Sequence, residues 1–353
     1  MRLRFAPQGI LQWLATLGCL LLLMVGIMSS FLALIRMPGS SYTGPLQKLS
    51  AAESHSTARL AGHVRALAQD IGPRNIWTTG SMADSVRYIH DELAALGYQV
   101  EAQEVPSVKG MVVNLEIGIP GRKLASEIVV VGAHYDTVPD CPGANDNASG
   151  LAVLLELARL LADCEPQRTI RLVAFANEEA PFFATKSMGS RVYAMQARMR
   201  QEKITAMLSL ETMGYYSDER ESQFYPFPLS YFYPDQANFI AFVSNIKSRR
   251  LVRRAISAFR RHGHFPSEGL AAPVCIRGAS WSDHQSFWAE GYPAIMVTDT
   301  AFYRYAAYHT PYDTPEKLDY ERLARVVSGL AATIQELAST NQENMKRIEN
   351  GVR

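Results

Sequence analysis

Four short apolar segments of this chain are each followed by side chains that can bind a metal ion. The segments span residues 128–131, 170–176, 206–210 and 294–297, and the side chains that follow them are His134, Asp136, Glu178, Glu179, Glu211 and His309. Imidazole and carboxylate groups are ligands that suit zinc. If the segments are neighbouring strands whose carboxyl ends meet at one edge of a sheet, these side chains converge there. The sequence therefore predicts a metal site at that edge.

Asp146 lies in a small-residue segment, GANDNASG (143–150), just before an expected helix. A carboxylate has two oxygens and can bridge two ions, and two ions a few ångströms apart can hold one hydroxide and polarise one carbonyl. A further carboxylate is then needed to move the proton of the water. The adjacent pair Glu178 and Glu179 supplies one ligand and one free base. A lone pair of glutamates usually forms a solvated face, so this hypothesis depends on the whole ordered set.

The elements that must position these residues alternate in type. The four apolar segments are short and lack a polar face, as is typical of parallel strands that are covered by helices on both sides. Between the first two lies 151–161 (LAVLLELARLL), which is too long for a typical strand and indicates a buried helix. This rhythm predicts an α/β fold with a mostly parallel, doubly wound mixed sheet flanked by helices.

The remaining segments complete this expected domain. Helical spacing of apolar residues predicts helices over 57–70, 81–96, 248–262 and 323–337, and strands are expected over 98–105 and 111–117. The helix over 248–262 carries six arginines, which indicates a solvated basic face, with attraction to an acidic membrane surface or substrate as the alternative. Residues 223–242 are rich in Tyr, Phe and Pro and are expected to form a loop insertion over one end of the sheet.

The N-terminus differs from the rest of the chain. No residue from Phe5 to Ile35 is charged, and residues 13–35 would span roughly 34 Å as a helix, enough to cross a bilayer. The run lacks an A-x-A-like cleavage site, which favours an uncleaved transmembrane anchor over a cleaved signal peptide. Because Arg2 and Arg4 precede it, we expect a single-pass protein of the inner (cytoplasmic) membrane whose catalytic domain faces the periplasm or exterior.

Composition narrows the class of protein. The 353 residues carry a net charge of +1, with 48% hydrophobic and 20% charged residues. This balance is typical of a globular protein and disfavours both disorder and a nucleic-acid partner. Apart from Cys19, the chain has Cys141, Cys164 and Cys275, which leave open either one disulfide, with Cys141–Cys275 the better candidate, or three free thiols.

Six motifs, in order, resemble those of the co-catalytic two-zinc exopeptidases of the bacterial aminopeptidase and glutamate carboxypeptidase type. They are HYD (134–136), GANDNASG (143–150), NEE (177–179), SLETMG (209–214), SDH (282–284) and YHTPYDT (308–314). The resemblance implies that His134 and Glu211 bind one zinc ion and that Glu179 and His309 bind the other. Asp146 would bridge the two.

The resemblance also implies catalytic roles. Glu178 would be the general base and acid that activates a metal-bridging water, and Tyr308 would help to stabilise the tetrahedral intermediate. Asp136 would hydrogen-bond His134 and fix its tautomer. Two departures from the family pattern stand out. Many relatives have Asp where this chain has Glu211, whose extra methylene affects the metal spacing. Many also have a glycine soon after the glutamate pair, a difference that affects the pocket shape rather than the metal site.

The implied function is that of a zinc-dependent exopeptidase with two Zn²⁺ per chain, with an aminopeptidase that acts on peptides with a free N-terminus as the favoured form. A carboxypeptidase-like enzyme and a one-zinc glutaminyl cyclase are alternatives on a similar fold, and a catalytically inert binding module is a distant one. The expected division is an N-terminal membrane anchor (1–36), a linker (37–56) and a zinc peptidase domain (57–353). Residue specificity and oligomeric state stay open.

Some further residues are candidates for contacts with substrate. Arg304 is a candidate for binding a substrate carboxylate, since arginine binds this group through two hydrogen bonds. His284 is expected to have a structural or pocket-lining role. An apolar specificity pocket is one interpretation of several aromatic residues, with core packing as the other: Phe224, Tyr225, Phe227, Trp281, Phe287 and Trp288.

Overall fold

The computed structural model describes residues 9–273 and 275–339, and the chain divides into two compact units between Arg36 and Met37. The first unit holds helix α1 (Ile10–Ile35), whose 26 residues are long and apolar enough to cross a membrane. An N-terminal apolar helix is therefore present as predicted, and by length and composition it suits either an anchor or a signal sequence. Arg2 and Arg4, on which the expected orientation depends, lie outside the described residues.

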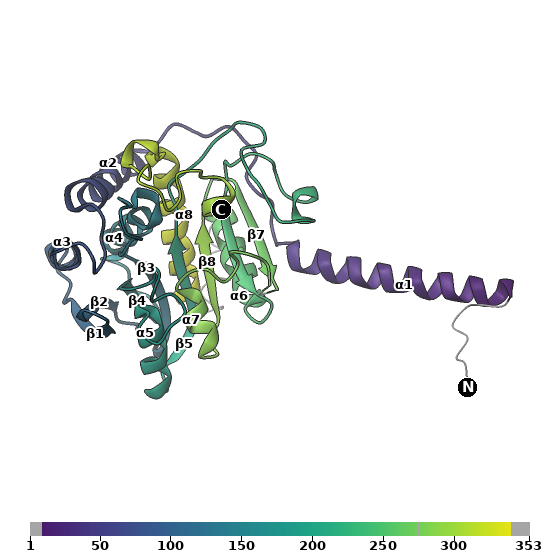
Figure 1. The fold of residues 1–353 in the computed structure, drawn as a ribbon, viewed down its shortest axis with the longest axis horizontal. Helices are drawn as coiled ribbons and strands as arrows, with labels where there is room; N and C mark the ends of the chain where they lie inside the picture. Colours follow the sequence, from purple (N-terminus) through teal and green to yellow (C-terminus); the bar gives the residue numbers. More distant parts are fainter. Residues whose placement is uncertain (1–8, 274, 340–353) are drawn as a thin grey trace. The chain divides into compact units, whose positions relative to one another are not determined.

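The second unit is built on one eight-stranded mixed sheet (Figure 1). Its strands are β1 (Glu101–Ser107), β2 (Gly110–Ile119), β3 (Leu124–His134), β4 (Arg168–Phe175), β5 (Lys203–Glu211), β6 (Ile240–Asn245), β7 (Ser267–Ala272) and β8 (Ala294–Thr298). They lie in the order β1-β2-β4-β3-β5-β8-β6-β7. The four central strands β4, β3, β5 and β8 are parallel to one another, so their carboxyl ends share one edge.

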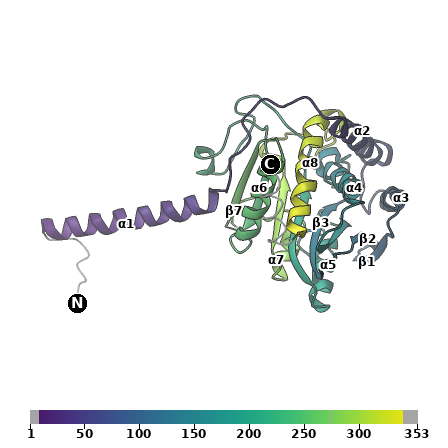
Figure 2. The same ribbon diagram turned by 180° about the vertical axis from the view of Figure 1, so that it is seen from behind.

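Helices cover both faces of this sheet, which confirms the predicted fold class. They are α2 (Ala51–Arg65), α3 (Ser81–Ala95), α4 (Gly150–Leu161), α5 (Gly189–Met199), α6 (Arg249–His262), α7 (His284–Ala289) and α8 (Tyr320–Ala338). In Figure 2, α8 lies over the sheet between α6 and α4, and it also packs on α2. Helices α5 and α7 contact each other on the opposite face.

The core follows from the apolar patterns. Val129, Val130 and Val131 of β3 have no exposed surface, because helices lie over both faces of this strand. Helix α4 is buried along most of its length, as its continuous apolar sequence predicts. Burying each large aliphatic side chain contributes roughly 1.5–3 kcal/mol, so these central elements form a rigid base for the strand ends.

Two parts of the fold differ from the sequence-based expectation. Helix α2 begins at Ala51 rather than at residue 57, because Ser50 and Glu53 form a capping box at its start. Strands β6 and β7 extend the sheet beyond β8, although neither was predicted. Strand β7 (SEGLAA) has no β-branched residue, and the first residues of β6 fall inside the segment that was expected to be a loop.

Candidate active site

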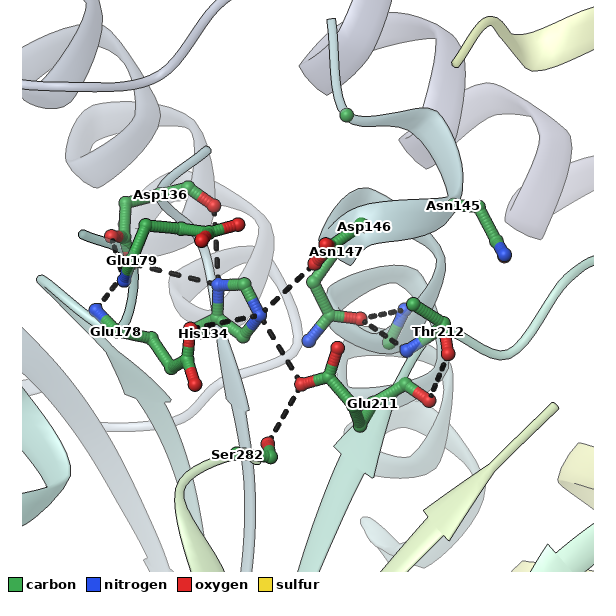
Figure 3. Close-up of polar contacts among 12 residues, drawn as sticks. His134, Asp136, Asn145, Asp146, Asn147, Glu178, Glu179, Glu211, Thr212 and Ser282 are labelled. Atoms are coloured by element: carbon green, nitrogen blue, oxygen red, sulfur yellow. Dashed lines mark hydrogen bonds and ion pairs between the residues drawn. The ribbon is translucent and has the colours of Figure 1, made fainter. Parts of the chain in front are cut away.

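Predicted metal-binding side chains lie at the shared carboxyl edge of the central strands, where Figure 3 shows His134, Asp146, Glu179 and Glu211. His134 is the last residue of β3 and Glu211 the last residue of β5. Glu178 and Glu179 follow the end of β4. The chain passes from β3 to β4 on one side and later returns to β5 on the other side of β3. Such a switch in strand order opens a crevice at the carboxyl edge, where ligands bind.

Five predicted ligands form two groups that share Asp146. In the first group, Nε2 of His134 lies 3.3 Å from Oδ1 of Asp146 and 3.3 Å from Oε2 of Glu211. In the second, Nε2 of His309 lies 2.9 Å from Oδ2 of Asp146 and 3.2 Å from Oε1 of Glu179. Figure 3 shows the His134 ring directed between Asp146 and Glu211. Each oxygen of Asp146 therefore faces a different group.

The donor set fits zinc. Nε2 of His134 and both carboxylate oxygens of Asp146 are buried and make no hydrogen bond within the part of the chain that the structure describes. Buried polar atoms without partners are costly and rare, and all three of these atoms point into the proposed metal groups. Ligand atoms at about 2.0–2.2 Å from a tetrahedral zinc ion lie roughly 3.3 Å apart, which matches the separations here.

Several buried carboxyl groups lie close together in the site, and this crowding shifts the pKa values of the site residues. Burial and the neighbouring Asp146 carboxylate raise the pKa of Glu179 to about 7. Burial also raises the pKa of Glu211 and holds that of Glu178 well above its usual range. Burial alone would lower the pKa of His309, but the Asp146 and Glu179 carboxylates raise it to about 10. The raised pKa values of the glutamates and of His309 together indicate excess negative charge, which a divalent cation would neutralise.

Asp136 holds the loop after β4 in place. Its carboxylate accepts hydrogen bonds from the backbone N–H groups of Glu178 and Glu179, both at 3.0 Å. The carboxylate oxygen lies 3.6 Å from Nδ1 of His134, beyond hydrogen-bonding distance. The backbone carbonyl of Asp136 lies 3.1 Å from Nδ1 instead. The expected contact with His134 is therefore made by the backbone of Asp136, and its side chain positions the two glutamates.

Asp313 and Asn145 support Asp146, and neither was singled out from the sequence. The Asp313 carboxylate accepts hydrogen bonds from the backbone N–H groups of Asn145 (2.8 Å) and Asp146 (3.0 Å), and from the hydroxyl of Tyr305 (2.9 Å). The side-chain amide of Asn145 donates to Asp299 at 2.8 Å. The signal for Asp313 was its place in YHTPYDT, four residues after His309.

Arg74 is a second missed residue, and it fixes the loop between β3 and α4. Its side chain is fully buried. The guanidinium donates to the backbone carbonyls of Tyr135 (2.8 Å), Pro142 (2.7 Å) and Gly143 (2.9 Å). One cation thus joins the start and the end of the loop that carries Asp146.

Tyr308 lies beside the site. Its ring stacks on that of His309 with 3.9 Å between centroids and 14° between planes. Burial and the site carboxylates raise the pKa of the Tyr308 hydroxyl, so it stays protonated and is able to donate a hydrogen bond. On the other side of the site, the Ser282 hydroxyl donates to Oε2 of Glu211 at 2.7 Å.

Arg304 makes structural contacts and is not among the residues that line the pocket, which argues against its suggested role in binding a substrate carboxylate. It is buried, and Nε donates to Oε1 of Gln223 at 2.7 Å. One terminal nitrogen donates to the carbonyls of Phe239 (2.9 Å) and Ala237 (3.3 Å). Arg304 therefore secures both ends of the aromatic insertion. His284 is also buried and contacts the carbonyl of Ala279, in line with a structural role.

An apolar pocket opens next to the metal groups and reaches both Glu211 and Tyr308. It encloses about 810 Å³ of empty space, including its opening to solvent. Tyr225 and Trp281 line this pocket, in agreement with the interpretation that aromatic residues form an apolar specificity pocket. Phe287 and Trp288 instead pack in the core near α5 and α7, and Phe224 and Phe227 are exposed.

The strand register places Glu211 in one row with other residues that line this pocket. Glu211 of β5 pairs with Thr298 of β8, Thr298 pairs with Ala241 of β6, and Ala241 pairs with Glu268 of β7. All four residues line the pocket. Adjacent strands lie about 4.8 Å apart, so this register row runs about 10 Å from Glu211 to Ala241. A neighbouring row, also lining the pocket, consists of Met296, Val243 and Leu270.

No disulfide joins the four cysteines, all of which belong to the described residues. Cys141 is buried, and its thiol contacts the carbonyl of Thr310 at 3.1 Å. Cys275 is exposed. The suggested Cys141–Cys275 bridge is therefore not formed, and the alternative of free thiols holds.

Comparison with known proteins identifies the family. Residues 114–334 match Peptidase family M28. The chain belongs to this family. It is similar to the uncharacterized protein YfbL of Escherichia coli K12, with 38% identity over 284 residues that cover 78% of this chain and 86% of YfbL. It is also similar to the aminopeptidase YwaD of Bacillus subtilis, with 29% identity over 60% of this chain and 41% of YwaD.

Solved structures share the fold of this M28 chain. BSAP, a zinc aminopeptidase from Bacillus subtilis, superposes with a TM-score of 0.62 at 17% identity, covering 84% of this chain and 97% of BSAP. A glutaminyl cyclase from Fimbriiglobus ruber superposes with a TM-score of 0.58 at 20% identity, covering 83% and 97%. The predicted family of zinc exopeptidases is confirmed, and zinc is the cofactor that the family match supports.

Proposed function

We propose that this protein is a zinc-dependent aminopeptidase that holds two zinc ions and removes the first residue of peptides with a free N-terminus. The observation that carries the proposal is the shared Asp146 carboxylate, whose oxygens face His134 at 3.3 Å and His309 at 2.9 Å. One carboxylate between two ligand groups is the arrangement that a two-ion site requires.

The ligands divide between the two ions. His134 and Glu211 would hold one ion, and Glu179 and His309 the other, with Asp146 common to both. When bound, the zinc ions supply Lewis-acid polarisation of the scissile carbonyl and lower the pKa of water.

Glu178 is the proposed general base and acid. It belongs to neither ligand group, yet its Oε2 lies 4.0 Å from Nε2 of His134. Because burial raises its pKa well above the usual range, the carboxylate accepts a proton readily and can return it to the leaving amine. Asp136 holds the backbone N–H of Glu178 and so orients this group. Tyr308, kept neutral beside the site, would donate a hydrogen bond to the developing oxyanion.

The pocket supports a preference for large apolar first residues. Its walls near the metal groups are aromatic and aliphatic, including Tyr225, Leu229, Trp281 and Met296. A bulky apolar side chain that enters from the site would cover the register row from Glu211 to Ala241. Because burial of apolar surface stabilises binding by about 25 cal/mol per Å², phenylalanyl and leucyl substrates should be preferred over alanyl ones.

The N-terminal helix is proposed to be an uncleaved anchor in the inner membrane, with the catalytic unit in the periplasm or exterior. Its 26 residues are long and apolar enough for a span. The corresponding division is an anchor over 1–36, a linker over 37–56 and a peptidase domain over 57–353. Within the linker, residues from Ala51 onward already form helix α2.

The deciding experiment uses the full chain, purified in detergent. Bound zinc is counted by mass spectrometry of the metal, and hydrolysis is followed with aminoacyl p-nitroanilides and their N-acetylated counterparts. We expect about two zinc ions per chain and cleavage of the free-amine substrates alone. One zinc with ammonia release from N-terminal glutamine would favour a cyclase, and cleavage of N-blocked peptides from the carboxyl end would favour a carboxypeptidase. Absence of bound metal would contradict the proposal.

A further inference from the structure

The segment 223–233, here called the aromatic loop, exposes an unusual set of side chains. Phe224 is 64% exposed, Phe227 is 81% exposed, Tyr231 is 77% exposed, and Phe232 is also exposed. Phe227 and Tyr231 contact each other edge to face, with 6.1 Å between ring centroids. Single exposed apolar residues are ordinary, but several exposed aromatic side chains close together mark an interaction surface.

The same loop covers the active-site pocket with its other side. Tyr225, Pro226 and Leu229 line the pocket, and Leu229 is buried. The backbone N–H of Phe224 donates to the carbonyl of Tyr303 at 2.8 Å, and the Tyr225 hydroxyl donates to the carbonyl of Pro234 at 2.7 Å. The loop is thus held as an ordered wall with a pocket face and an outward aromatic face.

The aromatic loop adjoins the point where the chain enters the catalytic unit. The Tyr233 hydroxyl donates to the carbonyl of Gly269 at 2.7 Å. A Cβ placed on Gly269 would lie 2.7 Å from Cγ of Met37, so the Met37 side chain packs directly on this glycine. Tyr233 and Met37 therefore meet at one residue of β7.

Hydrogen bonds hold the segment by which the chain enters the catalytic unit. Arg260 donates to the carbonyls of Pro38 (3.2 Å) and Gly39 (3.1 Å). The Ser41 hydroxyl accepts from the backbone N–H of Ser267 at 2.9 Å. A single residue, Arg36, separates Met37 from the last residue of α1. Two residues span at most about 7 Å, so the covalent connection between the last residue of α1 and Met37 is short.

We propose that the outward face of the aromatic loop inserts into the headgroup region of the bilayer that α1 spans. A tyrosine such as Tyr231 favours the membrane–water interface, where its ring lies in an apolar layer and its hydroxyl stays hydrated, and phenylalanine rings bury their apolar surface at the boundary of the headgroups. The short connection keeps the loop within reach of that interface, and the lipid surface is therefore the partner that its aromatic side chains fit. The inference depends on an uncleaved α1 but not on the proposed hydrolysis.

This placement would bring the pocket to the membrane surface. The residues that line the pocket and those that would enter the headgroup layer alternate along one short loop. Peptides that partition at the interface would then meet the pocket at a raised local concentration.

The test uses the full zinc-loaded chain in phosphatidylcholine vesicles with a bilayer-soluble phenyl-diazirine that reacts on illumination. Labelled positions are mapped by peptide mass spectrometry. We expect label in α1 and in 223–233, and none at Met199 or Val108, which are 81% and 69% exposed but lie far from this loop in the sequence. The double variant Phe227→Ser/Tyr231→Ser should lose the loop label and keep the α1 label.

Three results would overturn the inference. The first is label in α1 with an unlabelled loop, and the second is equal label in the loop and at Met199. The third is an unlabelled α1, which would remove the bilayer span on which the loop's position depends. Zinc content and peptide hydrolysis, measured on the same sample, report the proposed function separately.

Discussion

The carboxylate of Asp313 accepts a hydrogen bond from the backbone N–H of Asp146, with 3.0 Å between oxygen and nitrogen. Its second oxygen holds the neighbouring N–H of Asn145. These bonds fix the backbone that carries Asp146, the proposed shared ligand, although Asp313 itself is in neither of the two candidate groups. Groups of this kind orient metal ligands, and their loss commonly lowers metal affinity 10- to 100-fold.

We therefore expect Asp313→Ala to lower zinc affinity by about 10- to 100-fold without unfolding the protein. Competition with a coloured chelator measures the affinity, and circular dichroism reports the fold. Asp163→Ala, at an exposed position, is the matched control and should bind zinc as the unaltered chain does. Unchanged affinity in Asp313→Ala would show that the ligand loop is held by other contacts.

Two ligand variants distinguish a shared from a separate metal site. Asp146→Ala removes a carboxylate common to both groups, so bound zinc should fall close to zero. Glu179→Ala removes a ligand of one group and should leave about one ion per chain. Metal content after gel filtration gives both values. Equal zinc content in the two variants would argue against a bridging role for Asp146.

Glu178→Gln should separate catalysis from metal binding. The amide keeps the shape of the side chain but cannot carry the proton, so kcat should fall by about 10²–10⁴. Zinc content should stay unchanged, because Glu178 lies outside both ligand groups. Glu219→Gln, at an exposed position, serves as control. Loss of zinc together with activity would reassign Glu178 as a ligand.

The register row predicts a change of selectivity in Ala241→Phe. The new ring would fill the pocket floor about two strand spacings from Glu211. The ratio of kcat/KM for phenylalanyl over alanyl p-nitroanilide should fall by at least about tenfold, the effect of losing roughly one well-buried methylene or more. Ala102→Phe on the edge strand β1 is the control. A constant ratio would mean that the first side chain binds elsewhere.

His63 of α2 makes folding stability sensitive to pH. Burial, with the nearby Arg59 charge, lowers its pKa from 6.5 to about 4. The unfolded chain therefore binds a proton between these pH values while the folded chain does not, and stability falls as pH decreases through this window. The loss approaches about 3 kcal/mol by pH 4.

Urea denaturation at pH 7 and pH 5 tests this effect. His63→Gln should show a smaller loss of unfolding free energy between the two pH values, because the amide does not titrate. His90→Gln, at an exposed position in α3, should keep the pH dependence of the unaltered chain. An equal pH dependence in His63→Gln would contradict the assignment.

The central strands and their polar ends could be predicted because both signals are local. An apolar run such as 128–131 indicates a buried strand, and His134 follows it directly. The support from Asp313 could not be predicted in this way, since its contact with Asp146 joins residues 167 positions apart. The contacts of Arg304 could not be predicted either, because the Gln223 side chain lies 81 positions away and its other partners include backbone carbonyls, which have no signature in the sequence.

The register row joins strands that have different roles within one sheet. Glu211 belongs to the parallel strands, whereas Ala241 and Glu268 belong to β6 and β7, which extend the sheet beyond β8. Substitutions in these outer strands reshape the pocket floor while the ligand-bearing strand ends keep their backbone. The fold thus offers natural variation a route to new substrate preferences that leaves the inherited chemistry intact.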